Sequence, residues 1–277
     1  MKITDTEILQ AFIRTCEDGW LQGWHERNGG NLTYLLKAEE AEALKPFFRE
    51  ACGEWVQMGV QAENLRGTYF IATGSGKYFR NVPLAPEDNL CILEINDAGD
   101  SWRIVWGLEK GGRPTSEFPS HFLNHSVRKE VTKGENRVIY HAHPVNIVAM
   151  TYILPLTARD FTRALWKSET ECPVVFPQGV GVAPWMVPGG AEIAHVTSGL
   201  MKTYDAAVWA HHGLFVSGPD LDTAFGLMHT IEKAAEIYML VQSAGGGRTG
   251  QTIPDSGIRD IARDFGVTIN EAFLNAE

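Results

Sequence analysis

The spacing of hydrophobic and polar residues along the chain predicts alternating helices and strands. Apolar residues recur at helical spacing over residues 5–21, and again from Asp222 to three glycines at 245–247. Two apolar runs, 90–95 and 102–106, flank a polar turn and predict an antiparallel hairpin. The other predicted strands are 32–36, 69–72, 137–143, 174–176, 180–182 and 207–218, and the other predicted helices lie near 41–48, 117–129, 146–154, 157–168, 191–204 and 258–265.

The order of these elements predicts an α/β fold with a mixed sheet, because helices alternate with strands and one pair of strands forms a hairpin. No internal repeat, low-complexity segment or linker divides the chain, so residues 1–277 are predicted to form a single domain. Residues 37–68 are charged and weakly periodic, and we expect them to be peripheral.

Composition and charge narrow the class of protein. The net charge of −10 and the isoelectric point near 5.4 oppose a broad surface for nucleic acid or an anionic membrane, because both partners require a basic face. The first residues are acidic without a long apolar run, and Pro155 interrupts the longest apolar stretch, 147–156. We therefore expect a soluble protein without a signal peptide. The four scattered cysteines favour reduced thiols and a cytoplasmic location.

Two histidines one residue apart, His141 and His143, follow a run of β-formers. On a strand they point to the same face and form half of a metal site. The pair alone is a weak signal, because chance gives roughly 0.3 such pairs in a chain of this composition. A second buried-looking strand ends in His211 and His212, and one of these two would supply the third protein ligand that a catalytic zinc needs. The other histidines have no such neighbours, and surface or core roles are the simpler interpretation: His25, His121, His125, His195 and His229.

Three turns of the chain are suited to holding an oxyanion. An asparagine and glycine loop precedes the strand at 32–36, a second glycine turn follows the strand at 69–72, and a third turn opens the helix at 117–129, with Ser116 as its expected N-cap. Backbone N–H groups in such turns and at helix N-termini can hold a phosphate. Glu117 lies at the third turn. Taken singly, the first loop is more simply an ordinary turn, and the default role of Glu117 is to complement the helix dipole. The second turn is as compatible with a plain hairpin or strand end as with a phosphate site.

Together these segments resemble the class II aldolase/adducin superfamily along essentially the whole chain. The resemblance implies a three-layer αβα fold with a central mixed, largely antiparallel sheet. It also implies one Zn²⁺ per subunit, held by His141, His143 and His212, with Glu117 beside the metal as the acid and base. The segments that carry the resemblance are ERNGGNLT at 26–33, TGSGK at 73–77, PTSE at 114–117, HAH at 141–143, VPG at 187–189 and HG at 212–213.

The same resemblance implies how substrate is held. A glutamate at the position of Glu171 is expected to reach the site of a neighbouring subunit and to exchange the proton on the aldehyde oxygen. The resemblance also implies a homotetramer with active sites at its interfaces. The residues implied in binding the substrate phosphate are Asn28, Gly30, Asn31, Thr73, Ser75, Gly76, Thr115 and Ser116.

The implied reaction is the reversible cleavage of a phosphorylated ketose, L-rhamnulose 1-phosphate, to dihydroxyacetone phosphate and L-lactaldehyde, as in rhamnose degradation. A Lewis-acidic metal would stabilise the enediolate that such a retro-aldol cleavage leaves. The alternatives within the superfamily are an L-fuculose 1-phosphate aldolase, a sugar-phosphate 4-epimerase and a non-catalytic adducin-like interaction module. A three-histidine zinc hydrolase matches the number of ligands but leaves the three phosphate-suited turns unexplained.

Overall fold

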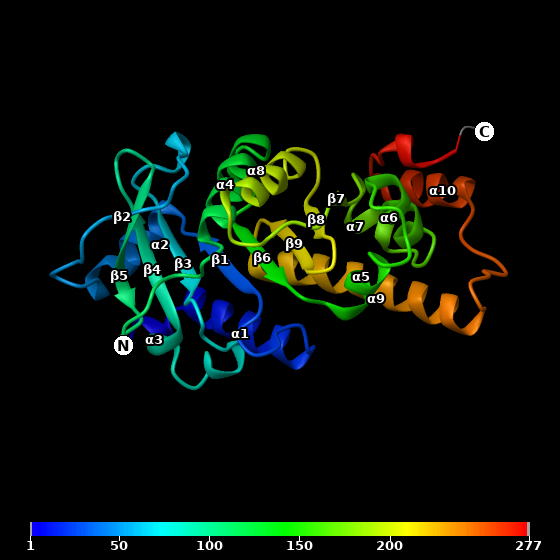
Figure 1. Ribbon diagram of the computed structural model, residues 1–277. Coiled ribbons are helices and arrows are strands. Elements are labelled where there is room, and N and C mark those ends of the chain that lie inside the picture. The colour runs from blue at the N-terminus through cyan, green and yellow to red at the C-terminus, as the bar shows by residue number, and fades with distance from the viewer. Residues whose placement is uncertain (1, 276–277) are drawn as a thin grey trace. The chain divides into compact units, whose positions relative to one another are not determined.

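The computed structural model describes residues 2–275, which form two compact units (Figure 1). The first unit comprises the chain up to Ala142 together with Val187–Ser198 and Ser217–Phe225. The second comprises His143–Met186, Gly199–Val216 and the chain from Gly226 onward. Each unit is built from separated parts of the sequence, and the single domain expected from the sequence stays a prediction.

The first unit contains six strands of a nine-stranded sheet, in the order β2-β5-β4-β3-β1-β6. Their neighbours pair antiparallel, and the predicted hairpin is formed by β4 and β5. All five residues of β1 are buried, including the polar Asn31 and Thr33, and all five residues of β6 are buried as well. The strands are β1 Asn31–Leu35, β2 Val56–Gln57, β3 Tyr69–Thr73, β4 Leu90–Ile95, β5 Ser101–Gly107 and β6 Val138–Ala142.

Helix α4 packs on this sheet through aromatic side chains. The ring of Phe70 on β3 meets Phe118 and Phe122 edge-on, with centroids 5.7 and 6.1 Å apart. These rings belong to a core whose other members include Leu93 and Leu65. The helices of this unit are α1 Glu7–Leu21, α2 Ala38–Leu44, α3 Pro86–Asn89 and α4 Phe118–Val131, with most of α8 Ala191–Leu200 and short 3-10 turns at Ile3–Asp5, Lys45–Phe47, Glu63–Leu65 and Phe79–Asn81.

The second unit contributes the mixed character of the sheet. Strand β7 runs parallel to β8, and β8 pairs antiparallel with β9. The ring of Trp166 lies edge-on to that of Phe273, with centroids 5.9 Å apart. The elements are α5 Val145–Met150, α6 Ala158–Trp166, α7 Cys172–Val175, β7 Gly181–Ala183, β8 Ala206–Trp209, β9 Gly213–Gly218, α9 Leu221–Ala244, α10 Asp255–Phe265 and a 3-10 turn Glu271–Phe273, with β9 and α9 each shared with the first unit.

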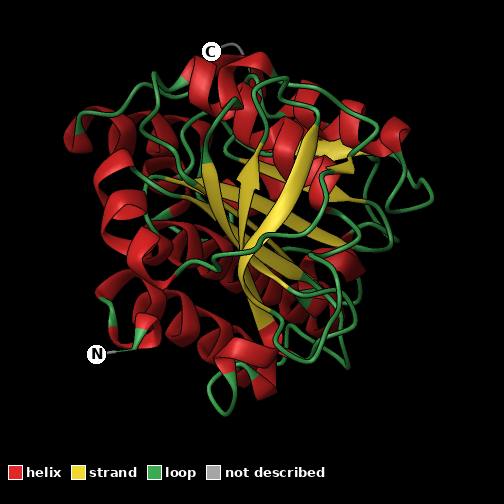
Figure 2. Cartoon of the chain, turned by 90° about the vertical axis from the view of Figure 1, so that its left-hand side faces the viewer, coloured by secondary structure: helices red, strands yellow, loops and turns green. Residues whose placement is uncertain are grey.

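The α/β class and the mixed, largely antiparallel sheet are confirmed. Figure 2 shows the strands in the middle, with helices on both sides. Among residues 2–275, no helix combines the length and the hydrophobicity that crossing a membrane requires.

Two predicted strands differ from the structure. Residues 174–176 were expected to be β, but the chain forms the short helix α7, whose first turn holds Pro173 where a missing N–H costs nothing. The expected strand 207–218 is two strands, β8 and β9, because His211 takes a positive φ of 59° and reverses the chain. His212 therefore lies in a turn and not on a strand.

Candidate active site

A buried carboxylate lies beside a histidine at one end of β1 and β6. The two strands pair so that Asn31 stands opposite His141. Glu117 precedes the first turn of α4, and it is the N-cap in place of the expected Ser116. The Asn31 amide donates to Glu117 Oε2 at 2.9 Å, and the same oxygen lies 3.7 Å from His141 Nε2. Glu117 is only 9% exposed, so this acid is held by neighbours rather than by solvent.

His143 and His212 come together in the second unit. Strand β6 ends at Ala142, one residue before His143, because the following Pro144 cannot donate to the ladder and instead caps α5. His212 lies in the turn between β8 and β9, with its ring centroid 4.9 Å from that of His143. Strand alternation, which predicted a shared face for the histidine pair, is therefore not what brings His143 to this position.

The start of α5, directly after His143, is anchored by a buried carboxylate. Glu232 on α9 accepts hydrogen bonds from the backbone N–H groups of Asn146 and Ile147 at 2.9 and 3.0 Å, and from the Asn146 amide at 2.8 Å. Burial raises the pKa of Glu232, and these three donors act in the opposite direction. An acid supplied by another helix thus satisfies N–H groups that α5 leaves unpaired in its first turn.

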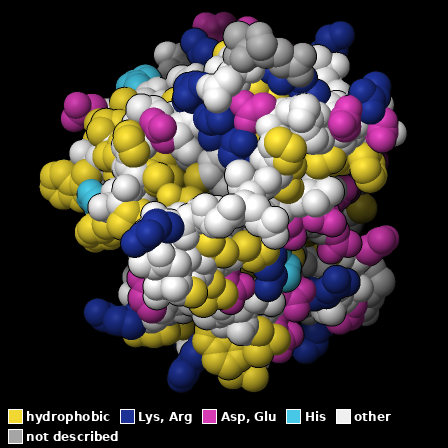
Figure 3. All heavy atoms as spheres, turned by 90° about the vertical axis from the view of Figure 1, so that its right-hand side faces the viewer, with side chains coloured by type: hydrophobic (Ala, Val, Ile, Leu, Met, Phe, Trp, Pro, Cys, Tyr) yellow, Lys and Arg dark blue, Asp and Glu magenta, His cyan; other side chains and the backbone are white. Residues whose placement is uncertain are grey.

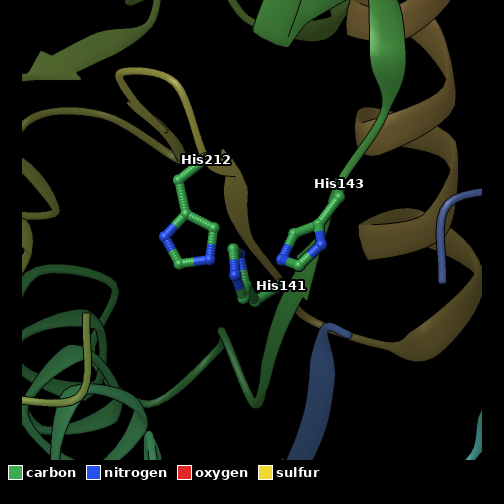
Figure 4. Close-up of side chains that lie close together, drawn as sticks. All are labelled: His141, His143 and His212. Carbon is green, nitrogen blue, oxygen red and sulfur yellow. The ribbon is translucent and has the colours of Figure 1, made fainter. Parts of the chain in front are cut away.

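Three imidazoles form a group that can hold a metal ion (Figure 4). His141, His143 and His212 each offer one nitrogen, and these nitrogens lie within 4.8 Å of one another. Zn–N distances near 2 Å place the nitrogens of a tetrahedral site roughly 3.3 Å apart, so small rotations of the rings suffice. Of the two candidates in the turn, His212 is the one in this group. His211 is exposed, and its Nδ1 lies 3.1 Å from Thr151 Oγ1.

The three predicted oxyanion turns are joined to one another in the first unit. Thr73 links them, because its hydroxyl accepts from the Leu32 N–H at 3.2 Å and its carbonyl accepts from the Thr115 N–H at 2.9 Å. Ser75 donates its N–H to the Arg113 carbonyl at 2.8 Å. Of the predicted phosphate residues, Asn31, Thr73 and Thr115 are buried, Gly30 is half-buried, and Asn28, Ser75, Gly76 and Ser116 are exposed or partly exposed.

Gly30 makes the closest backbone approach in this region. It has a positive φ of 73°, and a Cβ there would lie 2.4 Å from His25 Nδ1 and 2.7 Å from the His141 carbonyl oxygen. His25 is buried under the loop, where Nδ1 donates to the Gly29 carbonyl at 3.0 Å and Nε2 lies 2.7 Å from the Tyr140 hydroxyl. Burial raises the pKa of Tyr140 well above its usual value, so the phenol donates to that nitrogen. His25 thus fills a core role that supports the loop.

Glu171 is exposed at the N-cap of α7 in the second unit, and it is outside the histidine group found among residues 2–275. Burial, and then the negative charge of Glu171, raise the pKa of the neighbouring Glu169. The expected action of Glu171 in a neighbouring subunit stays a prediction.

The buried histidines behind Glu117 were not predicted to have a part in the site. His121 and His125 were given core roles, and both are fully buried on α4, but their ring nitrogens meet the hydroxyl of Thr33 at 2.7 and 2.8 Å. A signal was present, because His121 and His125 are one helical turn apart, and Asn31 and Thr33 share one face of β1.

The fold and this site agree with the family that the sequence of the chain matches. The family described as Class II Aldolase and Adducin N-terminal domain matches residues 10–239, and the chain belongs to it. It is 45% identical to rhamnulose-1-phosphate aldolase of Pectobacterium atrosepticum over 272 residues, 98% of each chain, and 45% identical to the enzyme of the same name from Mannheimia succiniciproducens, over 98% of this chain and 99% of that one.

Solved structures agree with this assignment. A sugar-phosphate aldolase from Thermotoga maritima matches with a TM-score of 0.73 and 27% identity, covering 88% of this chain and 97% of that one. L-fuculose-1-phosphate aldolase from Thermus thermophilus has the same fold, with a TM-score of 0.57 and 21% identity over 87% of this chain and 97% of its own.

Proposed function

We propose that this protein is a zinc-dependent aldolase that reversibly cleaves L-rhamnulose 1-phosphate to dihydroxyacetone phosphate and L-lactaldehyde. The observation that carries the proposal is the buried carboxylate of Glu117, 3.7 Å from an imidazole of a three-histidine group. The similarity over 98% of the chain to enzymes named rhamnulose-1-phosphate aldolase supports this substrate over others of the class.

His141, His143 and His212 would hold the metal. Three imidazoles are a donor set found in catalytic zinc sites, and they suit zinc better than magnesium or calcium, which prefer oxygen ligands. A bound zinc ion supplies a Lewis acid that polarises the substrate's ketone and stabilises negative charge on its oxygen.

Glu117 would move the proton at the carbon that loses its bond. In cleavage its acid form delivers a proton to that carbon, and in synthesis its carboxylate removes the same proton. The hydrogen bond from Asn31 holds the carboxylate in one orientation while it acts. Glu171 is exposed, and its carboxylate would act as the base that takes the proton of the substrate hydroxyl in a neighbouring subunit.

The three joined turns would hold the phosphate. Asn28, Ser75, Gly76 and Ser116 offer exposed donors, and the buried hydrogen bonds of Thr73 and Thr115 hold the turns together. Gly30 allows a close approach of the backbone, and Asn31 keeps one amide hydrogen for a ligand. Since the chain carries a net charge of −10, local donors rather than a general positive field must bind the dianion.

The proposal includes a cytoplasmic homotetramer with one catalytic domain per chain. Large apolar side chains are exposed in the second unit, among them Val145 and Tyr152 at 70% and Trp185 at 61%. Figure 3 shows hydrophobic side chains gathered in patches on one face. Apolar patches of this kind mark surfaces that pair with other proteins. Sedimentation of the metal-loaded protein tests this part, and a monomer at micromolar concentration would contradict it.

The substrate is tested by product mapping. Metal-loaded protein is given L-rhamnulose 1-phosphate or L-fuculose 1-phosphate, and dihydroxyacetone phosphate and free L-lactaldehyde are measured separately. We expect both products, with a higher kcat/KM for the rhamnulose sugar. A higher kcat/KM for L-fuculose 1-phosphate would transfer the assignment to that sugar, and a 4-epimer formed without free aldehyde would replace aldol cleavage by epimerisation.

A further inference from the structure

A line of buried polar side chains runs behind Glu117 inside the first unit. We infer that Thr33 and His121, acting through Asn31, are positioning residues that fix the Glu117 carboxylate for proton transfer. The inference rests on the proposed role of Glu117, but its geometry is independent of the metal and of the second unit.

The line is continuous in hydrogen-bond distance. The Thr33 hydroxyl lies 2.7 Å from His121 Nδ1, His121 Nε2 contacts Asn31 Oδ1, and the Asn31 amide reaches Glu117 Oε2 at 2.9 Å. On the far side of Thr33, the Nε2 of His125 lies 2.8 Å from the same hydroxyl. Every member is between 0 and 9% exposed, so water does not compete for these contacts.

The donors and acceptors can be ordered from the carboxylate backward. A carboxylate only accepts, so the Asn31 NH₂ must face Glu117 and its carbonyl must face His121. That carbonyl requires the proton on His121 Nε2, which leaves Nδ1 to accept from the Thr33 hydroxyl. His125 Nε2 then donates to Thr33. The Ile139 carbonyl is a more distant acceptor for the Thr33 hydroxyl, at 3.5 Å, so the shorter contacts favour this arrangement of neutral imidazoles.

Packing alone gives no reason for these residue types. His125 lies edge-on to Phe70, with centroids 5.0 Å apart, in surroundings where an apolar side chain would fit. Burying polar rings costs free energy that a hydrophobic replacement avoids. His125 Nδ1 also has no hydrogen-bond partner among residues 2–275, so the site bears an unpaired buried polar atom. The polar line is explained by what it ends on, which is the carboxylate beside His141.

Removing the hydroxyl group of Thr33 tests the inference. Thr33→Val keeps the shape of the side chain and leaves His121 Nδ1 without its donor, so Asn31 and Glu117 gain rotational freedom. We expect kcat to fall about tenfold or more with KM and zinc content unchanged, because misplacement of a reacting group affects the chemical step. Thr33→Ser restores the hydroxyl and should return kcat to within about twofold of wild type. Thr15→Val removes another buried hydroxyl, on α1, and should leave kcat unchanged.

A spectroscopic readout separates this inference from the proposed function. In protein with ¹⁵N-labelled histidine at neutral pH, His121 and His125 should both appear as neutral rings protonated at Nε2, with signals assigned by their loss in single variants. A His121 ring protonated at Nδ1 would overturn the inference whatever the activity. Failure of the wild-type protein to cleave any ketose phosphate would instead remove the proposed function.

The kinetic outcomes are equally decisive. Wild-type kcat in Thr33→Val, or an equal loss in Thr33→Ser, would overturn the inference, because the hydroxyl would then be irrelevant to turnover. If Thr33→Val does not fold, Thr33→Ala takes its place, since it also removes the hydroxyl that donates to His121 Nδ1 and introduces no new polar group. A fall in kcat at unchanged KM and zinc content is expected there too, and wild-type kcat would overturn the inference.

Discussion

Asn31 and Glu117 are joined by a 2.9 Å hydrogen bond from the asparagine amide to Oε2, although 86 residues separate them in the chain. The pairing of β1 with β6 puts Asn31 opposite His141, and the start of α4 brings Glu117 to both. One side chain of the asparagine loop thus orients the acid that stands next to a histidine of the candidate metal centre. The proposed proton transfer depends on this relationship.

Mutation is expected to distinguish the role of Glu117 in proton transfer from the role of the histidines in holding the metal. Glu117→Gln keeps the size and the contact with His141 but cannot transfer a proton, so we expect metal content near wild type and a loss of turnover of about 10² to 10⁴. His143→Ala removes an imidazole of the group and should lose the metal. Metal analysis beside the aldolase assay checks both. Equal metal loss in the two variants would make Glu117 a ligand and not an acid and base.

Gly30 should tolerate no side chain. A Cβ would collide with His25 Nδ1 and with the His141 carbonyl, and the positive φ adds strain. Gly30→Ala should therefore destabilise the protein by about 2–4 kcal/mol and lower activity. The matched control is Gly23→Ala, where φ is 77° but nothing lies within 4 Å, with an expected cost of about 1 kcal/mol. Denaturant unfolding compares the two, and equal costs would refute the close-approach argument.

Glu232→Gln tests the anchor behind His143. The variant turns an NH₂ toward N–H groups that need an acceptor, and we expect a loss of about 1–3 kcal/mol in the free energy of unfolding. Metal affinity should also fall roughly tenfold, as happens when groups that orient ligands are removed. Glu236→Gln, on the same helix but paired with Lys233 at the surface, should change stability by less than about 0.5 kcal/mol. A Glu232→Gln protein as stable as this control would show that the anchor is unimportant.

Acid should destabilise the protein through its buried imidazoles. Burial lowers the pKa of His121 to about 3, and burial, then His121 and Arg137, lower the pKa of His125 well below its usual value. Unfolded histidines bind protons below about pH 6.5, and these folded ones do not. Full stability is thus present above about 6.5 and is lost as pH falls, by about 1.4 kcal/mol per pH unit per histidine.

This pH dependence is measured on metal-free protein by urea unfolding between pH 7.5 and 5, so that loss of zinc does not contribute. In His125→Phe the slope should fall by about half, because only one of the two rings remains. A slope in this variant as steep as in the wild type would assign the acid lability to other groups.

Much of the fold was predictable because its elements follow local rules. The helix at 5–21 and the hairpin at 90–106 have clear periodicity, and the structure contains both. The strand predicted at 174–176 failed because a short apolar run does not distinguish strand from helix, and Pro173 favours a helical first turn. The chain reversal at His211 depends on a positive φ at a residue that is not glycine, which no pattern announces.

In the candidate site, too, some features were predictable from the sequence and others were not. The three histidines of the candidate metal site and Glu117 were named from motifs, and the structure groups the three imidazoles. What sequence could not supply was the contact between Asn31 and Glu117, or the histidines behind them. These depend on the register between β1 and β6 and on the face of α4 that is buried, which are tertiary properties.

The most direct test of the central claim is release of dihydroxyacetone phosphate from L-rhamnulose 1-phosphate by the purified protein. We expect one equivalent of dihydroxyacetone phosphate for each L-lactaldehyde, loss of the reaction after chelation, and recovery on adding one zinc per chain. Zinc-replete protein that forms no dihydroxyacetone phosphate from this sugar, from L-fuculose 1-phosphate or from related ketose phosphates would contradict it.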